Sequence, residues 1–281
     1  MIIRSGVVLV WVGCFLFFSV NAQVLESNSV GDRNFAFQVK HLEEFFERFN
    51  DVKTTYLAQY IKNKYPGVSI DRPTLIKGLF NNEEKNWDTD QLNEFVNQVT
   101  DSVTPILLDF YSGEWFAETL CKCIYKGKVI NVRIILKILG NEHDGSKWLL
   151  ESAHAADIDL ESDSMPSGII LRSKKFINPL SHITYFAGMT KALNDRKHIY
   201  DYLDSGFISS SSSRKFLNVL LRKKLTYEYV KKITFHFLQI DGWVFTVNEF
   251  NRESVNSGWL ISSMQKALPF EKITYKEKLP Q

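Results

Sequence analysis

One stretch near the middle of the chain limits its fold more than any other, because every second residue in it is apolar. Between positions 129 and 139 these apolar residues are Ile130, Val132, Ile134, Leu136 and Ile138. A period of two places their side chains on one face of an extended backbone, which is typical of a β-strand with one buried face. The stretch therefore predicts a strand of an antiparallel sheet.

The predicted strand belongs to a hairpin, and the pattern of this hairpin recurs near the C-terminus. A polar turn at residues 140–145 contains two glycines, which tolerate positive φ, and the return strand brings in Trp148. The second hairpin turns at residues 251–258, and its return strand begins with Trp259. In both strands the Trp is followed by Leu, an aliphatic residue, a polar residue and Ser. The repeat predicts one fold unit used twice, with the two Trp residues in equivalent places.

Helical periodicity precedes the first hairpin. From residue 37 to Tyr65, apolar and aromatic side chains recur at steps of three and four, and Pro66 ends the pattern. We expect one long amphipathic helix over these residues. Two short helices should follow, capped by Asp71 and Asp88.

The remaining segments complete the two expected units. A sheet region is expected at residues 106–111, followed by a long strand at residues 114–125. A second amphipathic helix is expected from residue 179. The five consecutive serines at residues 209–213 predict a flexible loop where the first unit has its short helices, so the second unit should be the shorter one.

The order of elements predicts an α+β fold made of two successive helix-plus-curved-antiparallel-sheet units. Two unrelated α+β domains with antiparallel sheets are the plain alternative. The acidic, turn-rich stretch in the middle of the chain is the best linker. The expected parts are a signal peptide (1–22), a mobile leader (23–36), a first domain (37–158), a linker (159–178), a second domain (179–268) and a C-terminal tail (269–281).

The N-terminus has the three-part pattern of a secretory signal peptide. Arg4 precedes an apolar core at residues 7–20, and small residues precede Gln23, before which cleavage is expected. The core is shorter than the about 20 residues that span a bilayer, so cleavage is favoured over a permanent anchor. Lipid attachment at Cys14 is disfavoured, because a strongly apolar stub follows it. We expect an exported protein of a bacterial periplasm or cell surface, with no stable membrane span after signal removal and with envelope association as one option.

Charge and motifs exclude several classes of function. The 34 basic and 32 acidic side chains give a net charge of +2, which leaves no strong field for nucleic acid, and no nucleic-acid partner is expected. The chain has no glycine-rich phosphate loop, no Gly-x-Ser-x-Gly and no His-Glu-x-x-His, so no cofactor is expected. Its six histidines are scattered singly, and no metal site is expected.

Cys121 and Cys123 are predicted to be free thiols. Two residues separated by one in a strand point the same way and lie too far apart for an ordinary disulfide. Buried thiols of this kind pack as small apolar groups.

The order of a long helix, short helices and three or four antiparallel strands, together with the repeated Trp-bearing strand, resembles the nuclear transport factor 2-like family. The resemblance covers residues 37–158 and 179–268. In that family a curved sheet wraps around the first helix, and its members include ketosteroid isomerase, dehydratases, transport adaptors and secreted modules. The resemblance implies a pocket between the concave face of the sheet and the long helix.

The apolar face of the strand at residues 114–125 supplies the candidates for lining this pocket: Trp115, Thr119, Cys121, Cys123 and Tyr125. An isomerase-like site also needs a carboxylate base and a proton donor, and this face has no carboxylate. Glu118, Glu151 and His154 have other parities, and strict alternation does not place Glu151 and His154 on one strand face.

Two functions remain open from the sequence. The first is an exported, non-enzymatic binding or scaffold module with an unknown protein or small ligand, favoured because the duplication carries no duplicated polar site. The alternative is a small-molecule pocket enzyme, isomerase- or dehydratase-like, in the first domain. An open cavity with converging carboxylate, Tyr and His groups would favour the enzyme.

Overall fold

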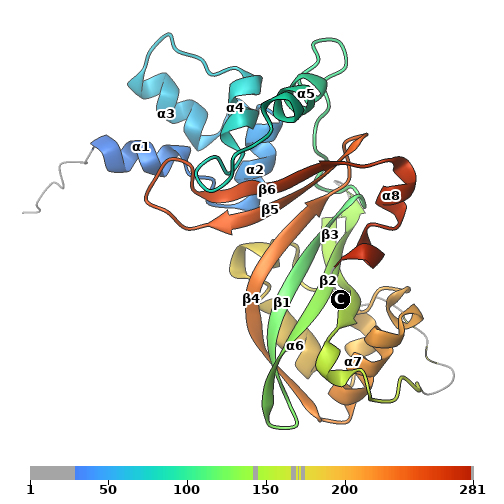
Figure 1. Ribbon diagram of the computed structural model, residues 1–281. Helices are drawn as coiled ribbons and strands as arrows, with labels where there is room; N and C mark the ends of the chain where they lie inside the picture. Colours follow the sequence, from blue (N-terminus) through green and yellow to red (C-terminus); the bar gives the residue numbers. More distant parts are fainter. Residues whose placement is uncertain (1–28, 142–144, 166–168, 170, 172–174, 280–281) are drawn as a thin grey trace, which may run out of the picture.

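The computed structural model describes residues 29–141, 145–165, 169, 171 and 175–279, and the expected signal peptide lies outside them. Six antiparallel strands form one sheet in the order β3-β2-β1-β4-β5-β6 (Figure 1). The strands are β1 (Trp115–Tyr125), β2 (Lys128–Asn141), β3 (Gly145–His154), β4 (Leu225–Phe237), β5 (Trp243–Phe250) and β6 (Gly258–Lys266).

Helices precede each group of three strands, and two short ones follow the last strand. The first group is α1 (Ser29–Phe37), α2 (Leu42–Phe49), α3 (Tyr56–Lys64), α4 (Arg72–Gly78) and α5 (Thr89–Val99). The second group is η1 (Ala156–Ile158), η2 (Pro179–Thr184), α6 (Gly188–Asn194), η3 (Ile199–Tyr202), η4 (Phe207–Ser209) and α7 (Ser211–Leu221). The C-terminal pair is α8 (Pro269–Ile273) and η5 (Lys276–Lys278). Among the described residues, no helix is long and apolar enough to cross a membrane.

The α+β class is confirmed, whereas the division into two successive units is not, because both groups of strands join one sheet. β1 and β4 pair with each other over their full lengths and fuse the two groups. Each helical group then covers the sheet edge formed by the other group of strands. Val39 and Phe80 form parallel bridges to β6, and Ile177 and Leu203 form bridges to β3. The segments before β1 therefore protect the edge of the last strand, and those before β4 protect the edge of β3.

A row of aromatic side chains crosses the buried face of the sheet and explains where the core lies. Trp115 on β1 is stacked on its cross-strand partner Phe237, with ring centroids 5.5 Å apart, and Phe237 is stacked on Phe245 of β5 at 4.8 Å. Trp148 on β3 meets Trp115 edge to face at 5.2 Å. Phe45 of α2 packs on Phe237 at 5.7 Å. Cross-strand aromatic pairs of this kind stabilise a sheet beyond the area that they bury.

The expected long helix is wrong, because the chain breaks it between α2 and α3. Asp51 has a left-handed φ of 57°, which a helix interior does not allow. The side chain of Asn50 exchanges two hydrogen bonds of 2.8 Å with the backbone of Leu108, which holds the break against the following loop. The next helix starts afresh at Thr55, whose side chain accepts from the N–H of Ala58 at 3.1 Å.

Other expectations need correction as well. Residues 106–111 form no strand, because Asn50 and Arg72 already bind backbone groups of that segment. The leader contains helix α1. The serine run begins α7, and Ser213 is buried there with its hydroxyl accepting from the N–H of Ala153 at 3.0 Å. The second amphipathic helix is divided into η2 and α6 by two successive left-handed residues, Tyr185 and Phe186.

Candidate functional site

The five residues predicted to line a pocket lie in the filled core of the sheet. Trp115, Thr119, Cys121 and Cys123 have no exposed surface, and Tyr125 is 8% exposed. The hydroxyl of Thr119 donates to the carbonyl of Ile134 at 3.0 Å. None of the surface hollows described below is lined by any of the five. Strand alternation correctly placed them on one face, and that face is packed with aromatic side chains.

The two cysteines are free and buried, as predicted. Burial raises the pKa of the Cys121 thiol to about 12, and burial, followed by the neighbouring Cys121, raises the pKa of Cys123 as well. Thiols in such surroundings are protonated and unreactive near neutral pH. Within the described part of the chain, no group of three or more His, Cys, Asp or Glu residues is arranged to hold a metal ion.

The surface is hollowed beside the N-terminal helices. Three adjoining hollows of about 140, 300 and 270 Å³ share Arg48 and Leu57, and we call them together the N-terminal groove. Figure 1 shows α1 and α3 projecting from the body of the molecule beside α4. The groove follows the break between α2 and α3 that the sequence did not predict.

The floor of the groove is apolar. Leu57 and Ile61 of α3 are buried with Ala36 of α1 in a small core that is separate from the main one. Leu75 of α4 and Ile70 before it pack against this core and line the groove. Two short helices joined by so few apolar contacts gain little stability from each other, and polar contacts of Arg48 and Arg252 add to them.

Arg48 fixes α1 against α2. Its guanidinium donates to the carbonyls of Ala36 at 3.2 Å and Gln38 at 2.7 Å, and also to the carbonyl of Phe37. These carbonyls end helix α1 and have no helical partner of their own. Burial lowers the pKa of Arg48 to about 10, although the nearby charges of Glu44 and Glu47 act to raise it. Arg48 therefore remains charged, and its guanidinium is hydrogen-bonded to backbone carbonyls.

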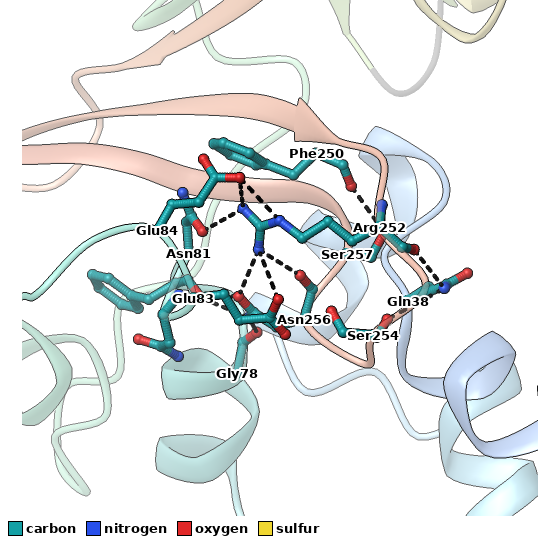
Figure 2. A network of polar contacts seen from close by, with 12 residues as sticks. Gln38, Gly78, Asn81, Glu83, Glu84, Phe250, Arg252, Ser254, Asn256 and Ser257 are labelled. Atoms are coloured by element: carbon teal, nitrogen blue, oxygen red, sulfur yellow. Dashed lines mark hydrogen bonds and ion pairs between the residues drawn. The ribbon is translucent and has the colours of Figure 1, made fainter. Parts of the chain in front are cut away.

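Arg252 is the centre of the polar network drawn in Figure 2, next to one wall of the groove. From the turn between β5 and β6 it donates to Asn81 Oδ1 at 2.7 Å, to the carbonyl of Asn256 at 2.9 Å and to Glu84 Oε1 at 3.1 Å. The amide of Gln38 donates to the carbonyl of Arg252 at 3.3 Å. The network ties the last hairpin to the end of α4, so Asn256 is held where it lines the groove.

One end of the groove is acidic, and part of its charge has no partner. Glu43, Glu44 and Glu47 of α2 line the 300 Å³ hollow. Glu44 lies 3.5 Å from Arg48. Glu43 Oε1 lies 2.7 Å from Nε2 of His182, but its Oε2 is buried and has no hydrogen-bond partner among the described residues.

Glu47 is the least compensated of these carboxylates. No hydrogen bond or ion pair joins its side chain to another residue of the described chain. Burial, followed by the charges of Glu44 and Glu43, raises the pKa of Glu47 above its usual value. The exposed side chains of Tyr56 and Ile183, at 51% and 41%, stand beside it. The groove thus combines an apolar floor with an uncompensated negative end.

The opposite face of the sheet carries a second polar cluster. Glu118 Oε2 lies 2.9 Å from Nε2 of His236, and Tyr275 Oη lies 3.0 Å from Nδ1 of the same ring. Glu118 Oε1 lies 2.5 Å from Nε of Arg133. Burial would raise the pKa of Glu118, but the hydrogen bond and charge of His236, together with Arg133, outweigh it and the pKa is lowered. Burial, then the charge of Glu118, raises the pKa of Tyr275 to about 12.

The expectation that Glu151 and His154 do not share a strand face is wrong. Ile135 pairs with Ser152 and Leu136 with Leu150, so Glu151 is an extra residue in a β-bulge. A bulge interrupts alternation and re-aims the side chains after it. Glu151 and His154 consequently line the same hollow of the surface. Counting alternate residues along the sequence does not reveal a bulge. β3 also has no glycine at that point to mark one.

Comparisons with known proteins identify no relative: no family model, no curated protein and no solved structure matches the chain. Nothing in them identifies the nuclear transport factor 2-like fold that the sequence resembles.

Proposed function

We propose that the protein is an exported, non-enzymatic binding module whose N-terminal groove binds a basic segment of a partner protein. The observation that carries the proposal is the unpaired carboxylate of Glu47 beside the apolar floor around Leu57. The partner segment would supply a Lys or Arg flanked by apolar side chains.

Charge complementarity supports a cationic partner. A half-buried carboxylate with a raised pKa is one whose ionised form is poorly solvated. A partner cation would supply the missing counter-charge to Glu47. Arg48 is buried and already bound to backbone carbonyls, so it does not neutralise Glu47 fully.

The apolar floor supports a peptide rather than a free metal or small cation. Val52 and Val68, exposed by 41% and 57%, continue the floor of Leu57, Ile61 and Ile70. Each apolar side chain that is buried on such a floor contributes about 25 cal/mol per Å². A segment that alternates cationic and apolar residues uses both parts of the groove.

The alternative, a small-molecule pocket enzyme, receives less support. It needs an open cavity on the core face of the sheet, and the residues proposed to line that cavity are buried among aromatic side chains. We therefore favour the binding module.

We also infer that the chain arose by an internal duplication whose helices are exchanged. When β4, β5 and β6 are matched to β1, β2 and β3, the strand order β3-β2-β1-β4-β5-β6 is symmetric about the middle of the sheet. Trp148 and Trp259 both lie on edge strands: Trp148 bridges to Ile177, which follows it in the chain, and Gly258, next to Trp259, bridges to Val39, which precedes it. This arrangement supports two related units that share one sheet, and a comparison of the two halves in an experimental structure tests it.

The binding proposal is tested with two short labelled peptides. One is composed of leucine and lysine, and the other has glutamate in place of lysine. Fluorescence anisotropy should detect binding of the lysine peptide only. Glu47→Gln should weaken this binding by about tenfold, the effect of losing one partly buried charge pair. Equal binding of both peptides would contradict the proposal.

Glu94→Gln is the matched control. Glu94 on α5 is 53% exposed, pairs with Lys266 at 2.8 Å and lies outside the groove. The substitution removes the same charge from the molecule. It should leave the affinity unchanged, and an equal loss in both variants would show that only net charge matters.

Export is proposed on the three-part N-terminal pattern alone. Mass spectrometry of the protein recovered from its native envelope should find Gln23, or its cyclised form, at the N-terminus. A retained Met1 or a lipid on Cys14 would rule out this processing.

A further inference from the structure

The surface hollow that contains Glu151 and His154 is separate from the N-terminal groove. It has a volume of about 350 Å³ and lies between β2, β3, the first residues of α7 and the C-terminal segment. Figure 1 shows α7 and the C-terminal end near β2 and β3. We call it the sheet hollow.

A guanidinium and an imidazole stand next to each other in the sheet hollow. Arg133 on β2 and His154 on β3 are register partners and both line it. Side chains of directly paired residues lie on the same face of an antiparallel sheet, with Cβ atoms about 5 Å apart. Carboxylates do not bridge them: the imidazole of His154 has no hydrogen bond or ion pair with any described residue.

The guanidinium of Arg133 is held in position, but among the described residues only its Nε has a partner. Its Nε forms an ion pair with Glu118 at 2.5 Å, without the alignment of a hydrogen bond. Glu118 in turn lies 2.9 Å from His236, and this contact fixes the carboxylate that holds the guanidinium. Its two terminal amino groups have no partner among the residues that the structure describes. These groups form the planar fork that suits the two oxygens of an anion.

The other charges of the sheet hollow do not fill this fork. Both oxygens of Glu151 are taken by Nζ of Lys276, at 2.8 and 2.7 Å. The remaining carboxylate, Glu277, is exposed to solvent. Ser212 donates its hydroxyl to the carbonyl of Ala153 at 3.0 Å. Arg133 and His154 are therefore the basic groups of the hollow left to act on a ligand, next to the hydroxyl of Ser152.

We propose that the sheet hollow binds a small anion, a carboxylate or a phosphate, between the free amino groups of Arg133 and the ring of His154. This site is independent of the proposed function of the N-terminal groove. Lys276, held by Glu151, forms one wall of the hollow.

The test titrates the full chain with sodium phosphate and with sodium citrate, against sodium chloride of equal ionic strength. The Nε–Hε signal of Arg133 and the ring signals of His154 are followed by NMR. Saturable shifts with either anion, absent with chloride, support the proposal, and the better anion identifies phosphate or carboxylate as the ligand chemistry. Shifts with chloride of the same size, or none at all, overturn it.

Three variants sharpen the test. Arg133→Gln should raise the dissociation constant by about tenfold or more, and His154→Gln by about three- to tenfold. Lys122→Gln is the control, because Lys122 pairs with Glu228 at 3.4 Å outside the hollow, and it should change nothing. If Arg133→Gln fails to fold, His154→Gln decides, since that side chain has no described partner to lose. Unchanged affinity in His154→Gln with wild-type folding would remove His154 from the site and overturn the proposal.

Discussion

Gly258 lies against the backbone of Val39 so closely that a Cβ on residue 258 would stand 2.0 Å from the Val39 carbonyl oxygen. The contact is fixed by two hydrogen bonds, from the N–H of Trp259 to that oxygen at 2.7 Å and from the N–H of Val39 to Ser257 at 2.9 Å. Gly258 also has a φ of 92°. Only glycine fits both conditions.

Gly258→Ala should therefore lower the free energy of unfolding by at least about 2 kcal/mol, through backbone strain and the lost bridge. Urea denaturation followed by Trp fluorescence measures it. Gly113→Ala is the control, because an added Cβ at Gly113 meets nothing within 4 Å. Its expected change lies within about 0.5 kcal/mol. Similar losses in both variants would show that the approach of Val39 is unimportant.

Cys121 and Cys123 should behave as core thiols. Replacing both by Ser should cost about 1 to 3 kcal/mol for each hydroxyl left without a partner. The double Ala variant should keep peptide binding, and the native protein should react slowly with a thiol reagent, because burial raises both pKa values. Rapid labelling of the folded protein would contradict this assignment.

Glu118 should make stability depend on pH. Its folded pKa is lowered, so its contribution is fully present above the unfolded pKa of about 4.3 and is lost as pH falls through the folded value. Glu118→Gln leaves Arg133 and His236 without their carboxylate, and should cost about 1 to 3 kcal/mol at pH 7. Unfolding measured from pH 7 to pH 3 should show this difference shrinking at the acid end. A constant difference would mean that the charge of Glu118 is not what stabilises the cluster.

The contribution of Glu47 to the pH dependence of stability should have the opposite sign to that of Glu118. Its folded pKa is raised, so ionisation above that pKa reduces the stability of the free protein. Glu47→Gln should therefore be as stable as the native chain or slightly more stable at pH 7, by not more than about 0.5 kcal/mol, while it binds the lysine peptide less well. For the native chain, peptide affinity should fall as pH drops and Glu47 becomes protonated. Thermal unfolding and anisotropy on the same samples measure both effects, and a destabilised variant would assign Glu47 a structural role instead.

Alternation in the sequence predicted hairpin strands such as β2, because apolar side chains such as Ile134 report directly on one buried face, but the strand expected at residues 106–111 does not form. Caps at Asp71 and Asp88 likewise located two helices, and both carboxylates accept from the first-turn N–H groups. The break after Asn50 was missed because its cause, the pairing with Leu108, lies 58 residues away.

The candidate sites were not predictable for a related reason. Arg133 and His154 are neighbours only through strand register, and that register depends on a bulge at Glu151 which leaves no mark in the sequence. The N-terminal groove depends on a helix break and on Arg252, which reaches Asn81 from 171 residues away. Local pattern predicts which face of an element is buried, but not which distant element covers it.

The crosswise covering of the sheet edges also determines when the protein can fold during its synthesis. Val39 and Phe80, made early, find their backbone partners only on β6, which is made last. A nascent chain that ends before Gly258 lacks the whole edge on which the N-terminal helices rest. Such a chain cannot complete its first half while the ribosome is still at work, and it stays open until nearly every residue has been added.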